Sequence, residues 1–200
     1  MESYAVDKYA TTLNQICADR DIKVNLSHNL IFISPSTKVG TFKNMTTDEL
    51  VEQPYDLLHV APPMTPPAFI KESGISNEGG YVDVDKGSCR HITFGNIFSL
   101  GDASNLPTSK TAAAVAAQSG VAARNVLALL EKKKRDPFVD LRNVLDKGNI
   151  DSSYDGYTSC PLIVGKNELI LAEFAYDLKV KEVRFSSRLQ VDPISQPPLL

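Results

Sequence analysis

The sequence predicts an α/β fold, and three observations carry this prediction. An apolar run of strand length, residues 96–100, ends at the pair Gly101-Asp102. An alanine-rich segment with the length of a long helix follows over residues 111–130. Helical and strand-like patterns also occur along the rest of the chain. Because ligands bind at the carboxyl ends of strands in open α/β sheets, the same stretch predicts a binding site.

The first part of the chain predicts one helix and several short strands. Apolar residues recur every three or four positions over residues 4–18, which is the spacing of an amphipathic helix. Prolines exclude a helix or a central strand over residues 61–67 and predict a stiff loop. Strands are predicted at residues 22–26, 30–33, 39–42, 57–60 and 81–84, with 30–33 and 39–42 forming a hairpin around Pro35-Ser36.

After the long helix, the sequence predicts a linker and a strand pair. Residues 131–153 are charged and contain Pro137 and Gly148, so they are expected to form a linker or insertion with one helical turn near residues 139–145. Strands are predicted at residues 169–176 and 180–185, as an antiparallel pair, and a disordered tail at residues 187–200.

Composition excludes several functions. The 200 residues are 42% hydrophobic with a net charge of −3, so no basic surface for nucleic acid is predicted. The one dense basic run, residues 132–135, is typical of a solvated helix end. The cysteines form no C-x-x-C pair and have no histidine at ligand spacing, so no metal site is predicted. We expect no targeting peptide, because Met1 leads directly into a polar helical segment.

The three cysteines stand in different surroundings. Cys17 falls on the apolar side of the first helix and is expected to pack in the core. Cys89 lies in the polar turn 87–90. Cys160 lies in a segment of small polar residues, expected to be a loop that leads into a strand, and a thiol in such a partly exposed setting can react. Cys160 is therefore the candidate reactive residue.

The candidate binding site combines the Gly-Asp turn with the start of the long helix. Gly101 permits a tight exit from the strand and leaves Asp102 at its carboxyl end. Ser109, Lys110 and Thr111 can cap the helix, whose first alanines leave room for a flat ring or a phosphate near the backbone N–H groups. Each part has another interpretation, since strand-Gly-Asp turns are common and an alanine-rich face also serves close helix packing.

Four stretches of this sequence carry a resemblance to a known family. They are His59-Val-Ala-Pro-Pro-Met-Thr-Pro-Pro67, Gly80-Tyr-Val-Asp-Val-Asp85, Gly101-Asp-Ala-Ser-Asn-Leu-Pro-Thr-Ser-Lys-Thr-Ala-Ala-Ala-Val-Ala-Ala-Gln-Ser-Gly120 and Tyr154-Asp-Gly-Tyr-Thr-Ser-Cys-Pro-Leu162. In this order they resemble the carboxyl-terminal half of the sulfide:quinone oxidoreductases of the mitochondrial type. Apart from the linker, the resemblance runs from about residue 4 to about residue 185.

The resemblance implies a portion of a flavoprotein with two dinucleotide-binding (Rossmann-like) domains. Gly101 and Asp102 would close on FAD, with Asp102 binding the ribityl chain. Lys110, Thr111 and the helix start would lie against the isoalloxazine ring, where the helix dipole favours the charge of a reduced flavin. The implied regions are a partial central dinucleotide-binding-type domain (1–95), the closing strand and helix of the FAD domain (96–130), the linker (131–153), a redox-cysteine region with a small antiparallel β element (154–186) and the tail (187–200).

The resemblance also implies a reaction. Sulfide attacks a cysteine disulfide and leaves a persulfide, and the freed thiolate passes electrons through FAD to quinone. Cys160 would be one of the two redox cysteines, and the second would lie before residue 1. Hydrogen sulfide and quinone would be the substrates, with a small thiol or sulfite as the sulfur acceptor. The family is located at the mitochondrial inner membrane, which it contacts peripherally through helices not found in this chain.

Two alternatives stay open at this stage. The sequence contains no Gly-x-Gly-x-x-Gly loop for the FAD pyrophosphate, which favours a catalytically inactive fragment that folds partly or binds a partner. The type II NADH:quinone dehydrogenases share the Gly-Asp element and the alanine-rich helix with its glutamine. Cys160, followed by Pro161, favours the sulfide:quinone oxidoreductases over that second family.

Overall fold

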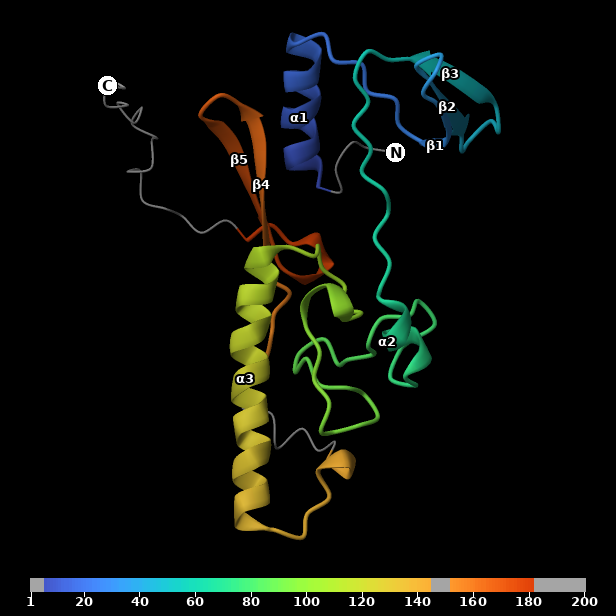
Figure 1. Cartoon of the computed structure of the whole chain (residues 1–200). Helices are drawn as coiled ribbons and strands as arrows, with labels where there is room; N and C mark the ends of the chain where they lie inside the picture. Colours follow the sequence, from blue (N-terminus) through green and yellow to red (C-terminus); the bar gives the residue numbers. More distant parts are fainter. Residues whose placement is uncertain (1–5, 145–151, 182–200) are drawn as a thin grey trace, which may run out of the picture. The chain divides into compact units, whose positions relative to one another are not determined.

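The computed structural model describes residues 6–144 and 152–181. It divides the chain into two compact units, Met1–Met64 and Thr65–Leu200, with the boundary inside the expected proline-rich loop. In the described residues, the first unit combines one helix with a small antiparallel sheet, and the second combines several helices with another (Figure 1). Within the described residues the one parallel pairing is an isolated bridge between Val82 and Ser104. The expected mixture of helix and sheet is confirmed in this coarse sense.

The first unit contains one helix and a three-stranded antiparallel sheet in the order β1-β2-β3. The expected amphipathic helix and hairpin are both confirmed. The third strand follows a turn in which Asn44 Oδ1 accepts hydrogen bonds from the N–H groups of Thr46 and Thr47, at 2.9 and 3.2 Å. The elements are α1 (Asp7–Asp19), β1 (His28–Ser34), β2 (Val39–Asn44) and β3 (Leu50–Pro54).

Two strands expected in this unit are absent. Residues 22–26 are not a strand, because the chain folds back on the end of α1 and the Ile22 N–H donates to Cys17 O at 2.9 Å. Residues 57–60 pair with no strand, and Leu57 is 91% exposed. Alternation predicted the strand at residues 22–26, and apolar residues predicted the one at 57–60, but neither segment pairs with a neighbouring strand.

The second unit is built around a long helix, α3 (Ala112–Arg135), and an antiparallel hairpin of β4 (Thr158–Gly165) and β5 (Glu168–Phe174). α3 contacts both β4 and the 3₁₀ turn η1 (Gly101–Ala103), which brings the Gly-Asp turn and the hairpin to one helix (Figure 1). The other elements are α2 (Ala68–Glu72), η2 (Leu141–Asn143) and η4 (Tyr176–Leu178).

The expected strands at residues 81–84 and 96–100 are wrong, because both segments are irregular. A tight turn at Asp85, whose Oδ1 accepts from the N–H and the hydroxyl of Ser88 at 2.8 Å each, reverses the chain before a ladder can form. Single bridges connect Val82 to Ser76 and Ser104, Val84 to His91, and Phe98 to Arg90.

The linker begins later than expected, because α3 continues to Arg135. Its last turn contains the basic residues 132–135, which the negative end of the helix dipole stabilises. The single helical turn expected near residues 139–145 is confirmed as η2.

Strand pairing after the linker also differs from the expectation. β5 covers most of the expected strand 169–176, but it pairs with β4, and Val180 makes only an isolated bridge to Phe174. Cys160 consequently lies inside β4 and not in a loop before a strand. The rest of the expected strand 180–185 and the expected tail lie outside the described residues.

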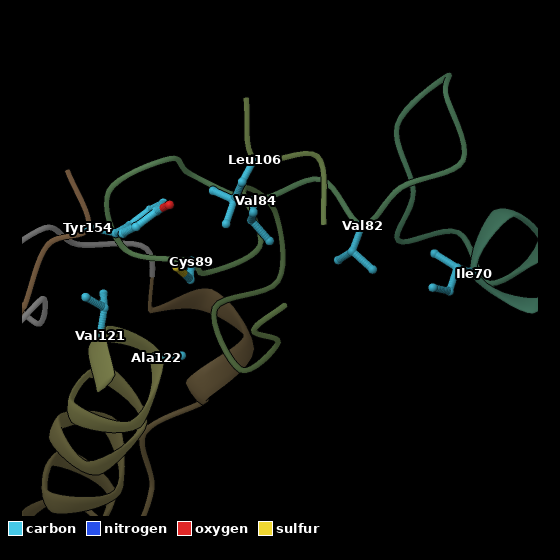
Figure 2. Close-up of a cluster of buried hydrophobic side chains, with 8 residues drawn as sticks. All are labelled: Ile70, Val82, Val84, Cys89, Leu106, Val121, Ala122 and Tyr154. Carbon is cyan, nitrogen blue, oxygen red and sulfur yellow. The ribbon is translucent and has the colours of Figure 1, made fainter. Parts of the chain in front are cut away.

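The core of the second unit joins α3 to the irregular segments (Figure 2). Cys89 is fully buried in this core and packs with residues from α3 and from the bridged loops. The buried cluster consists of Ile70, Val82, Val84, Cys89, Leu106, Val121, Ala122 and Tyr154.

α3 is long and apolar enough to cross a membrane by length and composition alone. Two of its polar side chains are nevertheless buried, and both make hydrogen bonds to other residues of the second unit. Gln118 accepts from the Gly101 N–H at 2.7 Å, and Asn125 donates to Ser88 O at 3.0 Å. These contacts are typical of a helix that packs in a protein core.

Candidate functional site

The Gly-Asp turn is fixed to α3 by buried hydrogen bonds. The Gly101 N–H donates to Gln118 Oε1 at 2.7 Å, and Gly101 O accepts from the Ser104 hydroxyl at 2.9 Å. Gly101 has a φ of +62°, and a Cβ at this position would lie 3.1 Å from Val115 Cγ2. Glycine is therefore required both by the backbone conformation and by the approach of α3. Asp102, the next residue, is exposed.

The start of α3 is capped as the sequence predicts. Thr111 is the N-cap, and its Oγ1 accepts from the Ala114 N–H at 3.1 Å. Among the described residues, no protein acceptor takes the N–H groups of Ala112 and Ala113. Two backbone donors and the positive end of the helix dipole therefore point out of the first turn, and the alanine side chains there do not obstruct them.

Lys110 braces the Gly-Asp turn. Its Nζ donates to Ser104 O at 2.6 Å and to Gly101 O at 3.3 Å, and it lies 4.9 Å from the ring centroid of Tyr81. Partial burial lowers the pKa of Lys110 from its usual value, while nearby Asp102 acts in the opposite direction. Two of the three ammonium donors are engaged within the protein, so Lys110 holds the turn in place.

Thr158, at the start of β4, ties the hairpin to the cap of α3. Its Oγ1 lies 2.8 Å from Thr111 Oγ1 and 3.3 Å from Ser109 O, although 47 residues separate the two threonines. Cys160 is half-buried two residues further along β4, on the same face as Thr158 because side chains alternate along a strand. The structure thus brings Thr111, Lys110, Gly101 and the strand that carries Cys160 to one end of α3.

A partly buried polar pair, Tyr157 and Glu173, lies on the opposite face of the hairpin. The Tyr157 hydroxyl donates to Glu173 Oε1 at 2.6 Å, and Glu173 is 5% exposed. The hydrogen bond to Glu173 raises the pKa of Tyr157, so the phenol stays protonated as the donor. Glu173 pairs with Ser159 in the strand register and therefore lies on the face away from Cys160.

The other two cysteines have different environments. Cys89 is fully buried, and this burial, with the neighbouring charge of Asp85, raises the pKa of its thiol to about 11. Cys17 is half-buried on α1, in the other unit, rather than fully packed in a core. All three cysteines are free thiols. Among the described residues, no group of three His, Cys, Asp or Glu side chains is arranged to hold a metal ion.

Two contributors to the site were not found from the sequence. Gln118 had a signal in the sequence, because an amide side chain among the alanines of a helix needs a hydrogen-bond partner when it is buried. Thr158 had no local signal, since its partners Thr111 and Ser109 lie far away along the chain.

Comparison with known proteins identifies relatives of this segment. The chain is 42% identical over 174 residues to the mitochondrial sulfide:quinone oxidoreductase of Mus musculus, 38% over 180 residues to that of Dictyostelium discoideum and 39% over 163 residues to that of Schizosaccharomyces pombe. These matches include 86%, 90% and 82% of this chain but only 35%, 36% and 32% of the relatives. The chain therefore spans about a third of the length of the curated relatives it matches.

The fold also has a counterpart among solved structures. A chain in the cryo-EM structure of the Tetrahymena thermophila mitochondrial ATP synthase matches with a TM-score of 0.67 and 26% identity, over 86% of this chain and 38% of that chain. No protein-family model matches the sequence. The three sequence matches agree with the family resemblance stated above. Over the matched residues, the chain is similar to the mitochondrial sulfide:quinone oxidoreductases.

Proposed function

We propose that the complete protein containing this segment oxidises hydrogen sulfide and passes the electrons through FAD to a quinone. The observation that carries this proposal is the place of Cys160, within a segment 42% identical to a sulfide:quinone oxidoreductase. Its strand is hydrogen-bonded through Thr158 to the start of α3. The segment would then form part of a flavoprotein with two dinucleotide-binding domains.

The residues at the start of α3 fit a flavin. Asp102 is exposed beside the Gly-Asp turn, and its carboxylate can accept a hydrogen bond from a ribityl hydroxyl. The N–H groups of Ala112 and Ala113 can donate to the ring, and the helix dipole there favours added negative charge. When bound, FAD supplies an acceptor for two electrons.

Lys110 and Thr111 would act on the cofactor indirectly. The Lys110 ammonium is engaged with the carbonyl groups of Gly101 and Ser104, and Thr111 caps the helix whose backbone faces the ring. Their proposed role is to hold Asp102 and the first turn of α3 in position.

Cys160 would form a disulfide with a second cysteine of the complete protein. Attack by hydrosulfide makes one S–S bond, breaks another and leaves one cysteine as a persulfide and the other as a thiolate. A small thiol or sulfite then takes the outer sulfur, and the disulfide forms again as two electrons leave. With a thiol as acceptor, one sulfide, one thiol and one quinone give one persulfide and one quinol, so atoms and electrons balance.

The proposed location is the mitochondrion, with peripheral contact to the inner membrane. The three relatives are named as mitochondrial proteins. A quinone acceptor dissolves in lipid, so an enzyme that reduces it must reach a membrane surface.

A second candidate is a role in assembly without redox chemistry. It is favoured by the similarity to a chain in a mitochondrial ATP synthase structure. The sequence identity to that chain is 26%, whereas the identity to the three oxidoreductases is 38% to 42%. The oxidoreductase proposal is therefore preferred.

The test compares two electron donors for the complete protein under anaerobic conditions. Sulfide should bleach the flavin absorption, and a short-chain quinone should restore it. Bleaching by NADH but not by sulfide would favour a type II NADH:quinone dehydrogenase. A stable complete protein that carries no flavin would favour the assembly role.

A further inference from the structure

We propose that the paired hydroxyl groups of Thr111 and Thr158 position Cys160 relative to the start of α3. This inference rests on the proposed function, since it concerns the geometry of the redox cysteine. Thr158 is 3% exposed, and its Oγ1 lies 2.8 Å from Thr111 Oγ1. The two threonines are positioning residues, because their hydroxyl groups contact each other and the backbone rather than the reacting thiol.

The direction of each hydrogen bond follows from the donors and acceptors present. Thr111 Oγ1 accepts from the Ala114 N–H at 3.1 Å, and the carbonyl of Ser109 can only accept. The arrangement that satisfies every group has Thr111 donating to Thr158 at 2.8 Å and Thr158 donating to Ser109 O at 3.3 Å. The result is one continuous chain of hydrogen bonds from the backbone of α3, through both hydroxyl groups, to the loop before the helix.

The position of Cys160 depends on this chain of hydrogen bonds. Thr158 and Cys160 lie on one face of β4, about 7 Å apart at a rise of about 3.4 Å per residue. Their register partners are Phe174 and Ala172 on β5, which hold the hairpin together. Those pairings do not attach the hairpin to α3. In the described residues, the hydroxyl pair is the side-chain hydrogen bond that connects β4 to the α3 cap.

The role of Thr111 in the site follows from this direction of hydrogen bonding. Its one hydroxyl proton is engaged by Thr158, so its side chain donates no hydrogen bond to a cofactor. The donors left for a ring at this place are the backbone N–H groups of the first turn. Reaction at a cysteine needs close alignment, and a displacement of about 1 Å can lower a rate by about a hundredfold.

A matched pair of variants separates the hydroxyl group from the packing of Thr158. Thr158→Val keeps the shape and removes the hydroxyl, whereas Thr158→Ser keeps the hydroxyl and removes a methyl group. In the complete flavin-loaded protein, Thr158→Val should slow sulfide-dependent flavin bleaching by about tenfold or more with unchanged flavin content. Thr158→Ser should retain most of the rate. Thr12→Val, on the exposed side of α1, is the control.

A second measurement needs neither flavin nor turnover. In the 200-residue chain, Thr158→Val should accelerate amide hydrogen exchange at Ala114 by about threefold or more, because the Thr111 cap loses the partner that orients it. Thr158→Ser should leave this exchange unchanged. If Thr158→Val does not fold, Thr111→Val and Thr111→Ser form a second pair that removes or keeps the other hydroxyl group. For this pair, the measurement is amide hydrogen exchange along β4, the strand that contains Cys160.

The two readouts separate this inference from the proposed function. The inference is overturned if Thr158→Val leaves Ala114 exchange unchanged, or if Thr158→Ser has the larger effect, which would indicate packing alone. If exchange behaves as expected but sulfide never bleaches the flavin, the hydroxyl pair stands as a structural connection and the proposed function fails.

Discussion

Replacing Gly101 with alanine tests whether the conformation and the packing of the Gly-Asp turn require glycine. Gly101 has a φ of +62°, and a Cβ there would lie 3.1 Å from Val115 Cγ2. The left-handed conformation costs a non-glycine residue about 1 to 2 kcal/mol, and relieving the contact with Val115 adds about 1 kcal/mol. Alanine also reduces the conformational freedom of the unfolded chain, which offsets about 0.4 to 1 kcal/mol of this destabilisation. We therefore expect Gly101→Ala to lower the free energy of unfolding by about 2 kcal/mol.

The assay is urea unfolding of the 200-residue chain, followed by the helical circular dichroism signal that α3 dominates. Gly120→Ala is the matched control, because Gly120 lies within α3 and a Cβ there would meet only Arg124 Nη2, at 4.0 Å. This control should stabilise the chain by about 0.5 to 1 kcal/mol, since alanine favours a helix interior. A Gly101→Ala variant as stable as the parent chain would refute the strain argument and leave the Gly-Asp pair an ordinary turn.

Two further predictions concern the site residues themselves. At pH 8, alkylation of the folded chain should label Cys17 and Cys160 well before Cys89, because the Cys89 thiol is fully buried with a pKa of about 11. Mass spectrometry of the labelled peptides measures the order of labelling. Labelling of Cys89 as fast as the other two cysteines would contradict its burial. In the complete protein, Asp102→Ala should weaken flavin retention by about tenfold to a hundredfold, the loss expected for a hydrogen bond to a charged group. Glu131→Ala, an exposed acidic position on α3, is its control, and equal flavin content in both variants would remove Asp102 from the site.

The sequence predicted the parts of the structure that have local causes. The alanine-rich pattern and the Thr111 cap place the start of α3 correctly, because both signals lie within a few residues of the helix. The hairpin of β1 and β2 was predicted for the same reason, since its turn and its alternation are contiguous. Gly101 was singled out because a tight turn before a helix demands its conformational freedom.

The remaining features depend on residues that are distant in the sequence. Residues 81–84 alternate like a strand, yet the Asp85 turn and the bridge between Val82 and Ser104 decide their structure. Cys160 was assigned to a loop because its small polar neighbours resemble one, whereas pairing with Ala172 on β5 makes it a strand residue. The hydrogen bond between Thr111 and Thr158 has no pattern in either segment alone.

The most direct test of the central claim is sulfide-dependent flavin bleaching by the complete protein with Cys160→Ser. A serine hydroxyl forms no disulfide and carries no sulfane sulfur, so bleaching by sulfide should be abolished while flavin stays bound. Cys17→Ser is the control and should bleach at the parent rate, because Cys17 lies on α1 in the other unit. Loss of bleaching in Cys160→Ser alone is the predicted result. Bleaching at the full rate in that variant would contradict the assignment of Cys160 as a redox cysteine.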